Sequence, residues 1–347
     1  MATNLQDEKF QQHMHVFRGI AIILIVCAHT VPSLDWRQNP LLGKLIDAIA
    51  NESSIFFFFI AGYLFQHLSG GFTFKKYLYQ KLKTVILPYL LLSIPAILVF
   101  TILTKRIGMW SWFYDLPVWG QMGLFLLTGK HLAPLWFVPT IAIYYLFAPV
   151  FLWIDRKYPK GYWVILPLIA LSTYVGRGGQ LGPLNFAMYL LPFYLLGMIC
   201  SRHKAAALQL VRRWWAVLLV VALIGMVGRI LEWSNPPYWG TPMKLALTLL
   251  FMWLLSRHHG VIGNRLDYAA EVSFGIFFIH AYFISAFKVA LVYFLTGTVY
   301  TGEGAEVIPG NALIFFAYVA AVLVASISVI WVAKKVFGKN SRMLIGA

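Results

Sequence analysis

The stretch FRGIAIILIVCAHTVP, residues 17–32, is the first long apolar run of the chain, and it holds Arg18 near one end and His29 near the other. Eleven positions separate them, which in an α-helix is about three turns and ~16 Å of rise, so both side chains point to one face. Ionisable groups at membrane depth usually face the bundle interior or a wet cavity. The spacing predicts a polar stripe that faces a shared chamber. The alternative is that Arg18 is an anchor at the membrane boundary and His29 is a packed core histidine.

Composition places the whole chain in a membrane. Of its 347 residues, 60% are hydrophobic and 12% are charged, and the mean hydropathy is +0.74. Soluble domains have about 45–50% apolar and about 25% charged residues. The two cysteines, Cys27 and Cys200, lie in or beside apolar runs, so neither a disulfide framework nor zinc-ligand spacing is present. We predict an all-α, polytopic helix bundle with no metal.

Ten apolar runs are long enough, or nearly so, to cross a bilayer as helices. They cover residues 16–34, 48–68, 84–104, 134–153, 162–176, 185–201, 214–232, 242–256, 272–295 and 310–333. The aromatic stretch at 109–127 is interpreted as interfacial or re-entrant. Residues 1–347 are assigned to a single transmembrane domain with no appended soluble domain.

The distribution of charge sets the expected orientation. With the N-terminus inside and ten spans, most of the 28 Lys and Arg residues fall in cytoplasmic loops, as the positive-inside rule requires. Both termini are therefore predicted to be cytoplasmic. The net charge of +16 is explained by orientation and attraction to the inner leaflet of the lipid bilayer, so no nucleic-acid partner is needed.

The motif R-x(10)-H, formed by RGIAIILIVCAH at 18–29, resembles the start of the integral-membrane acyltransferase family 3. Four later stretches resemble the family in the expected order. They are SIFFFFIAGYLF at 54–65, PLWFVPTIAIYYLFAPVF at 134–151, LPFYLLGMI at 191–199 and SFGIFFIHAYFI at 273–284. The ordered set, rather than any single match, carries the resemblance.

Two departures from the family pattern concern charge. Val16 and Phe17 precede Arg18, where the family often has an acidic residue. In QKLKTVILPYL at 80–90, Lys81 matches the first position of a basic R-x-x-R motif, while Thr84 occupies the second. Lys83 is the candidate substitute, although lysine lacks the bidentate fork of arginine.

The resemblance implies acyl transfer from acyl-CoA, typically acetyl-CoA, to a hydroxyl of a cell-envelope polysaccharide or lipid-linked sugar, at the bacterial inner membrane. His29 is the candidate general base, or the nucleophile of a covalent acyl-imidazole intermediate. Arg18, Lys81 and Lys83 are candidates for binding the donor phosphates. Glu52 is a candidate to orient His29; the alternatives are a charge at a helix start or exposure to the headgroups.

Trp136 and His280 are candidates for lining the substrate cavity, with an interfacial aromatic belt and a structural hydrogen bond as their alternatives. Arg229 and Glu232, three positions apart, are expected to form a local ion pair. Acetyl and succinyl donors, the acceptor sugar and the side of the membrane on which transfer occurs stay open. The competing function is a transporter or flippase for a surface glycan, but the sequence lacks the internal repeats of many transporter folds.

Overall fold

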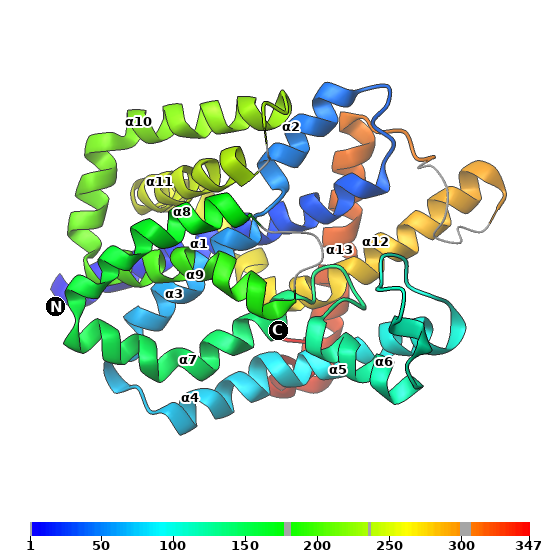
Figure 1. The fold of residues 1–347 in the computed structure, drawn as a ribbon, viewed down its shortest axis with the longest axis horizontal. Helices are drawn as coiled ribbons and strands as arrows, with labels where there is room; N and C mark the ends of the chain where they lie inside the picture. Colours follow the sequence, from blue (N-terminus) through cyan, green and yellow to red (C-terminus); the bar gives the residue numbers. More distant parts are fainter. Residues whose placement is uncertain (1, 177–181, 235–236, 299–306) are drawn as a thin grey trace.

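The computed structural model describes residues 2–176, 182–234, 237–298 and 307–347, which form helices joined by short connections (Figure 1). No strand forms among these residues. The α-helices are α1 (Ala2–Thr30), α2 (Pro40–Ala50), α3 (Ser54–His67), α4 (Phe74–Lys81), α5 (Leu87–Leu98), α6 (Val118–Thr128), α7 (Phe137–Lys157), α8 (Ile165–Val175), α9 (Pro183–Arg202), α10 (Lys204–Ile230), α11 (Pro237–Glu271), α12 (Ser273–Thr296), α13 (Ala312–Phe337) and α14 (Ser341–Leu344).

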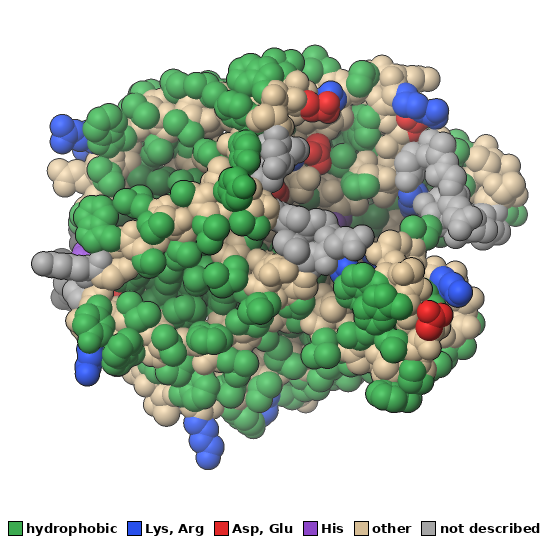
Figure 2. Space-filling view, in the orientation of Figure 1, with side chains coloured by type: hydrophobic (Ala, Val, Ile, Leu, Met, Phe, Trp, Pro, Cys, Tyr) green, Lys and Arg blue, Asp and Glu red, His purple; other side chains and the backbone are tan. Residues whose placement is uncertain are grey.

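Eight helical segments of the described chain are long and apolar enough to cross a membrane. They are Gln12–Ser33, Pro40–His67, Phe74–Leu103, Phe137–Lys157, Pro183–Arg202, Lys204–Ile230, Ser273–Thr296 and Ala312–Leu344. The face in Figure 2 is mostly apolar, and its lysine and arginine side chains lie mainly at the margins. The prediction of an all-α, multi-pass membrane bundle is confirmed.

The count of ten spans stays a prediction. The fifth predicted span corresponds to the shorter apolar segment Gly161–Val175, and the eighth corresponds to α11, where the side chains of residues 258–265 are not described. The aromatic stretch at 109–127 forms a 3-10 turn, Phe113–Asp115, and then α6. With 11 residues, α6 is too short to span the hydrocarbon core.

The second span is interrupted. Pro40 starts α2 at a position where its missing N–H costs nothing, and the helix ends before Asn51–Ser53, after which α3 begins. Glu52 has a positive φ of 59°, a conformation that is uncommon for a residue with a side chain. Irregular backbone at membrane depth is tolerated where it is buried in protein or lines a cavity, so this break marks a position to inspect for a site.

The third span contains a π-helical turn, Leu82–Ile86, between α4 and α5. Pro88 follows it; its ring nitrogen cannot donate to a carbonyl one turn earlier, and its ring crowds that carbonyl. The wider turn accommodates the proline without ending the helix, and such turns are frequent at functional sites. Lys81 is the residue that precedes this turn.

Helix α1 packs against α3, α11, α12 and α13. Its Phe17 ring lies 5.5 Å from the rings of Phe56 on α3 and Phe251 on α11, measured between centroids. Because α1 packs against several helices, Arg18 and His29 are each partly buried by protein. This position explains how one helix can carry both Arg18 and His29.

Candidate functional site

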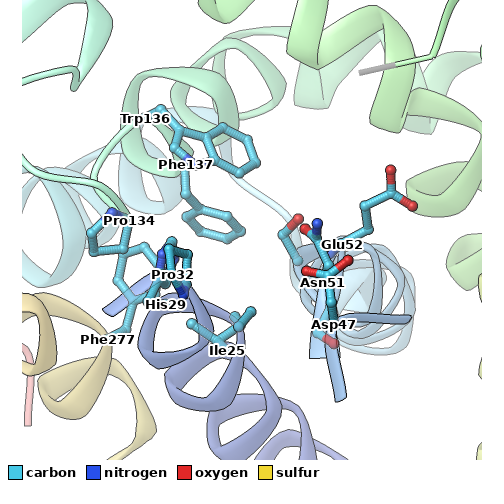
Figure 3. A pocket seen from close by; sticks show the side chains of 13 residues that line it. Ile25, His29, Pro32, Asp47, Asn51, Glu52, Pro134, Trp136, Phe137 and Phe277 are labelled. Carbon is cyan, nitrogen blue, oxygen red and sulfur yellow. The ribbon is translucent and has the colours of Figure 1, made fainter. Parts of the chain in front are cut away.

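A cavity of about 210 Å³ opens beside the C-terminal end of α1 (Figure 3). Its wall is built from three parts of the chain that are distant in sequence. One part is the end of α1 with His29, another is the break between α2 and α3 with Asn51 and Glu52, and the third is the start of α7 with Trp136. Phe277 of α12 completes the wall. The structure thus brings three of the predicted site residues to one cavity.

His29 lies beside a second histidine. The ring centroids of His29 and His280 are 5.4 Å apart and their planes are inclined by 40°. His280 is fully buried on α12, and its Nδ1 donates to the carbonyl oxygen of Ile276 at 2.9 Å. That bond assigns the proton to Nδ1 in the neutral ring, and His280 Nε2 has no hydrogen-bond partner among the described residues. His280 is not among the residues that line the cavity, where it was expected, and it packs against His29 instead.

The carboxylate of Glu52 does not face His29. In Figure 3 its side chain extends away from the imidazole, and Oε2 pairs with Nη1 of Arg229 at 3.3 Å. Nη2 of the same guanidinium pairs with Oδ2 of Asp47 at 3.1 Å. These contacts correct the expected pairing of Glu52 with His29. Glu52 borders the cavity, but its carboxylate is paired with Arg229 of α10.

The expected ion pair between Arg229 and Glu232 is also wrong. Glu232 pairs instead with Lys44 of α2 at 3.0 Å, in an exposed position. Helix α10 contacts α2, so Arg229 reaches carboxylates that lie far away in the sequence. Spacing along one helix identifies which residues of that helix are neighbours. It does not show whether a partner on another helix binds the same side chain instead.

Sequence reasoning missed Lys244, the most deeply buried cation of the described chain. It is fully buried on α11, and its Nζ donates to the carbonyl oxygen of Ile49 at 2.6 Å. It is close enough to Glu52, Asp47 and Arg229 for their charges to interact. A lysine inside the apolar run PMKLALTLLF is the signal that could have revealed it. We call Asp47, Glu52, Arg229 and Lys244 the interhelical charge cluster.

Trp136 borders the cavity with its indole ring almost completely buried. The ring lies 4.6 Å from that of Phe186 on α9, measured between centroids, and close to Phe137. The aromatic packing fixes the orientation of the indole, so the part of Trp136 that reaches the cavity offers a rigid apolar wall.

None of the three predicted donor-binding cations lines the cavity. Arg18 lies outside the cavity; its Nε donates to the carbonyl oxygen of Ala270 at 3.0 Å, and Nη2 donates to Nδ1 of His15 at 3.2 Å. The Nζ of Lys81 lies 5.1 Å from the ring centroid of Tyr145. Lys83 is exposed, over the ring of Tyr79. An exposed ammonium group over a neighbouring tyrosine ring is typical of a surface lysine.

Comparison with known proteins decides the family. The family model described as an acyltransferase domain matches residues 12–332 of the chain. The chain belongs to this acyltransferase family. The predicted family is thereby confirmed, and the protein is a membrane acyltransferase. No curated protein and no solved structure matches the chain.

The family match includes every residue of the cavity wall and of the interhelical charge cluster. Among the side chains that the structure describes, no group of three or more His, Cys, Asp or Glu is arranged to hold a metal ion. The titratable side chains that line the cavity are those of His29, Asp47 and Glu52, and His280 lies beside His29.

Proposed function

We propose that this acyltransferase moves an acyl group, acetyl in the simplest case, from acyl-CoA to a hydroxyl of a cell-envelope sugar at the bacterial inner membrane. The observation that carries the proposal is the position of His29. It lies on the wall of a cavity together with Trp136, on the helix that carries Arg18 about three turns earlier. One helix thus connects a candidate base with a candidate phosphate-binding cation.

Acyl transfer to an alcohol requires a base of suitable pKa within hydrogen-bond reach of the hydroxyl. A neutral imidazole at His29 accepts the hydroxyl proton while the oxygen bonds to the thioester carbonyl carbon. The carbon–sulfur bond then breaks, and the departing thiolate takes the proton back from the imidazolium. His280 is buried against His29, so we assign it a positioning role.

The shape and lining of the cavity support a small polar acceptor. Its volume of about 210 Å³ is below the about 300–1,000 Å³ of pockets that enclose whole drug-sized ligands. A cavity of this size has room for the reactive end of a sugar. Trp136 offers an apolar wall for a sugar face, and the side chains of Asn51 and Ser54 on the opposite wall can hydrogen-bond to hydroxyls.

The donor is expected to enter from the Arg18 end of α1. The phosphates of acyl-CoA need cations, and guanidinium groups bind phosphate through two parallel hydrogen bonds. The ~16 Å rise of α1 between Arg18 and His29 is comparable to the reach of an extended phosphopantetheine arm. Phosphate binding near Arg18 therefore allows the thioester to reach His29.

A transfer assay with purified protein in lipid nanodiscs tests the proposal. Labelled acetyl-CoA is supplied with a lipid-linked sugar, and wild type is compared with His29→Ala and with His203→Ala, a control at an exposed histidine. Loss of general-base catalysis should slow transfer by about 10²–10⁴-fold, whereas the control should be unaffected. Undiminished transfer by His29→Ala would remove the role of His29; a wild type that binds no acyl-CoA would contradict the proposed donor.

A further inference from the structure

A third cation lies beside Arg18 and Lys81, and it comes from the C-terminal part of the chain. Arg342 is on α14, which packs against α5 and against the π-helical turn Leu82–Ile86 that follows Lys81. In Figure 1 the red end of the chain lies next to α5. Arg342 is close enough to Arg18, and close enough to Lys81, for its positive charge to repel each of theirs.

The position of Arg342 is fixed by its own segment. The chain turns at Gly338, with φ 52°, and folds back. Ser341 Oγ donates to the carbonyl oxygen of Ala347 at 2.6 Å. A Cβ added at Gly275 of α12 would lie 2.7 Å from the Cβ of Ala347, so residues 341–347 are packed tightly against the helix that carries His280.

The charges of this group are not neutralised by the protein. Among the side chains that are described, none of Arg18, Lys81 and Arg342 forms an ion pair with a carboxylate. Glu271 is near Arg18 but is paired with Lys334 at 2.5 Å. The charges of Glu271 and Lys334 cancel formally. Asp267 pairs with His15, which contacts Arg18, so Arg18, Lys81 and Arg342 keep a formal excess of at least two positive charges. Like charges on both sides of Arg342, none of them paired with a carboxylate, are suited to binding a polyanion.

We infer that Arg342 belongs to the donor site and binds a phosphate group of the acyl donor together with Arg18 and Lys81. The inference rests on the proposed function, which supplies the phosphate-bearing donor. Arg342 takes the role for which Lys83 was the candidate, because it provides a guanidinium beside Lys81 whereas Lys83 lies on the surface. The donor site is thus completed by a residue about 260 positions away in the sequence from Lys81.

The test compares donors with and without phosphates. Full-length protein in nanodiscs is titrated with coenzyme A, and KM is measured for acetyl-CoA and for S-acetylpantetheine, which has no phosphate. The variants are Arg342→Gln, Arg342→Lys and the matched control Lys339→Gln, which removes an exposed cation from the same segment. Arg342→Gln should weaken coenzyme A binding and raise KM for acetyl-CoA by about tenfold or more. Its kcat should not change, and Arg342→Lys should be intermediate.

The phosphate-free donor separates binding from structure. KM for S-acetylpantetheine should be the same in wild type and Arg342→Gln, and Lys339→Gln should behave as wild type with both donors. Equal coenzyme A affinity in wild type and Arg342→Gln would overturn the inference, as would an equal loss with both donors. A wild-type protein that binds no coenzyme A would instead contradict the proposed donor itself.

Discussion

Arg229→Met tests the interhelical charge cluster most directly. The substitution keeps the length and the apolar part of the side chain but removes the cation that pairs with Asp47 and Glu52. Only 9% of the Arg229 side chain and 11% of the Glu52 side chain are exposed. The change therefore leaves the carboxylate of Glu52 buried without its main partner.

The two ion pairs contribute unequally to the cost. Breaking a buried pair by removing one partner costs about 3–5 kcal/mol, and this range applies to Glu52. The Asp47 side chain is 40% exposed, so water can replace Arg229 as its partner. Losing the pair with Asp47 therefore costs about 0–1 kcal/mol of stability. Lys244 stays close to Glu52 and stabilises its charge in part. We expect a loss of about 3 kcal/mol in the free energy of unfolding.

The assay is denaturant-induced unfolding in detergent micelles for Arg229→Met, Glu52→Gln and the double variant. The double variant should be more stable than Arg229→Met, because the unpaired charge is gone. Lys44→Met is the control; its pair with Glu232 is exposed on both sides and should change stability by about 0.5 kcal/mol or less. Unchanged stability of Arg229→Met, or simple addition of the two single effects, would refute the reasoning.

Two further predictions concern packing and pH. Gly62→Ala should destabilise the bundle strongly, because the added Cβ would collide with the carbonyl oxygen of Tyr194. Gly123→Ala should be neutral or stabilising, because its new methyl group meets open space. Thermal unfolding of the two variants compares these effects. Burial lowers the pKa of His131 to about 4, against the pull of its hydrogen bond to Phe125. The unfolded chain then binds more protons below about pH 6.5, so stability should fall by up to about 3 kcal/mol as the pH drops from 7 to 4. His131→Gln should remove most of that fall, and a persisting pH dependence would assign it to other groups.

The membrane fold could be predicted because apolar runs of sufficient length have few alternatives. The run around Arg18 and His29 is the core of α1, and the run that contains His280 is α12. Helical spacing also predicted that Arg18 and His29 face one chamber. This stays a prediction, because Arg18 does not line the cavity that holds His29. In the structure Arg18 contacts Ala270, at the end of α11, and His29 lies beside His280 on α12, two elements that adjoin along the chain.

Partners across the bundle could not be predicted from spacing. Glu52 and Arg229 are 177 positions apart, and their pairing depends on the break after α2, which no apolar pattern reveals. Lys244 was hidden for a similar reason, since one lysine hardly changes the hydropathy of its run. Arg342 follows the last apolar run, and only the fold-back against α5 and α12 brings it near Lys81.

The most direct test of the central claim is a structure of the protein with a non-hydrolysable thioether analogue of acetyl-CoA. A base lies about 2.6–3.2 Å from the hydroxyl oxygen, which lies about 3–3.5 Å from the carbon it attacks. The account predicts the analogue's acyl carbon within about 6 Å of a His29 ring nitrogen, with its phosphates at Arg18, Lys81 and Arg342. An acyl group bound away from the His29 cavity, or phosphates bound away from Arg18, would contradict it.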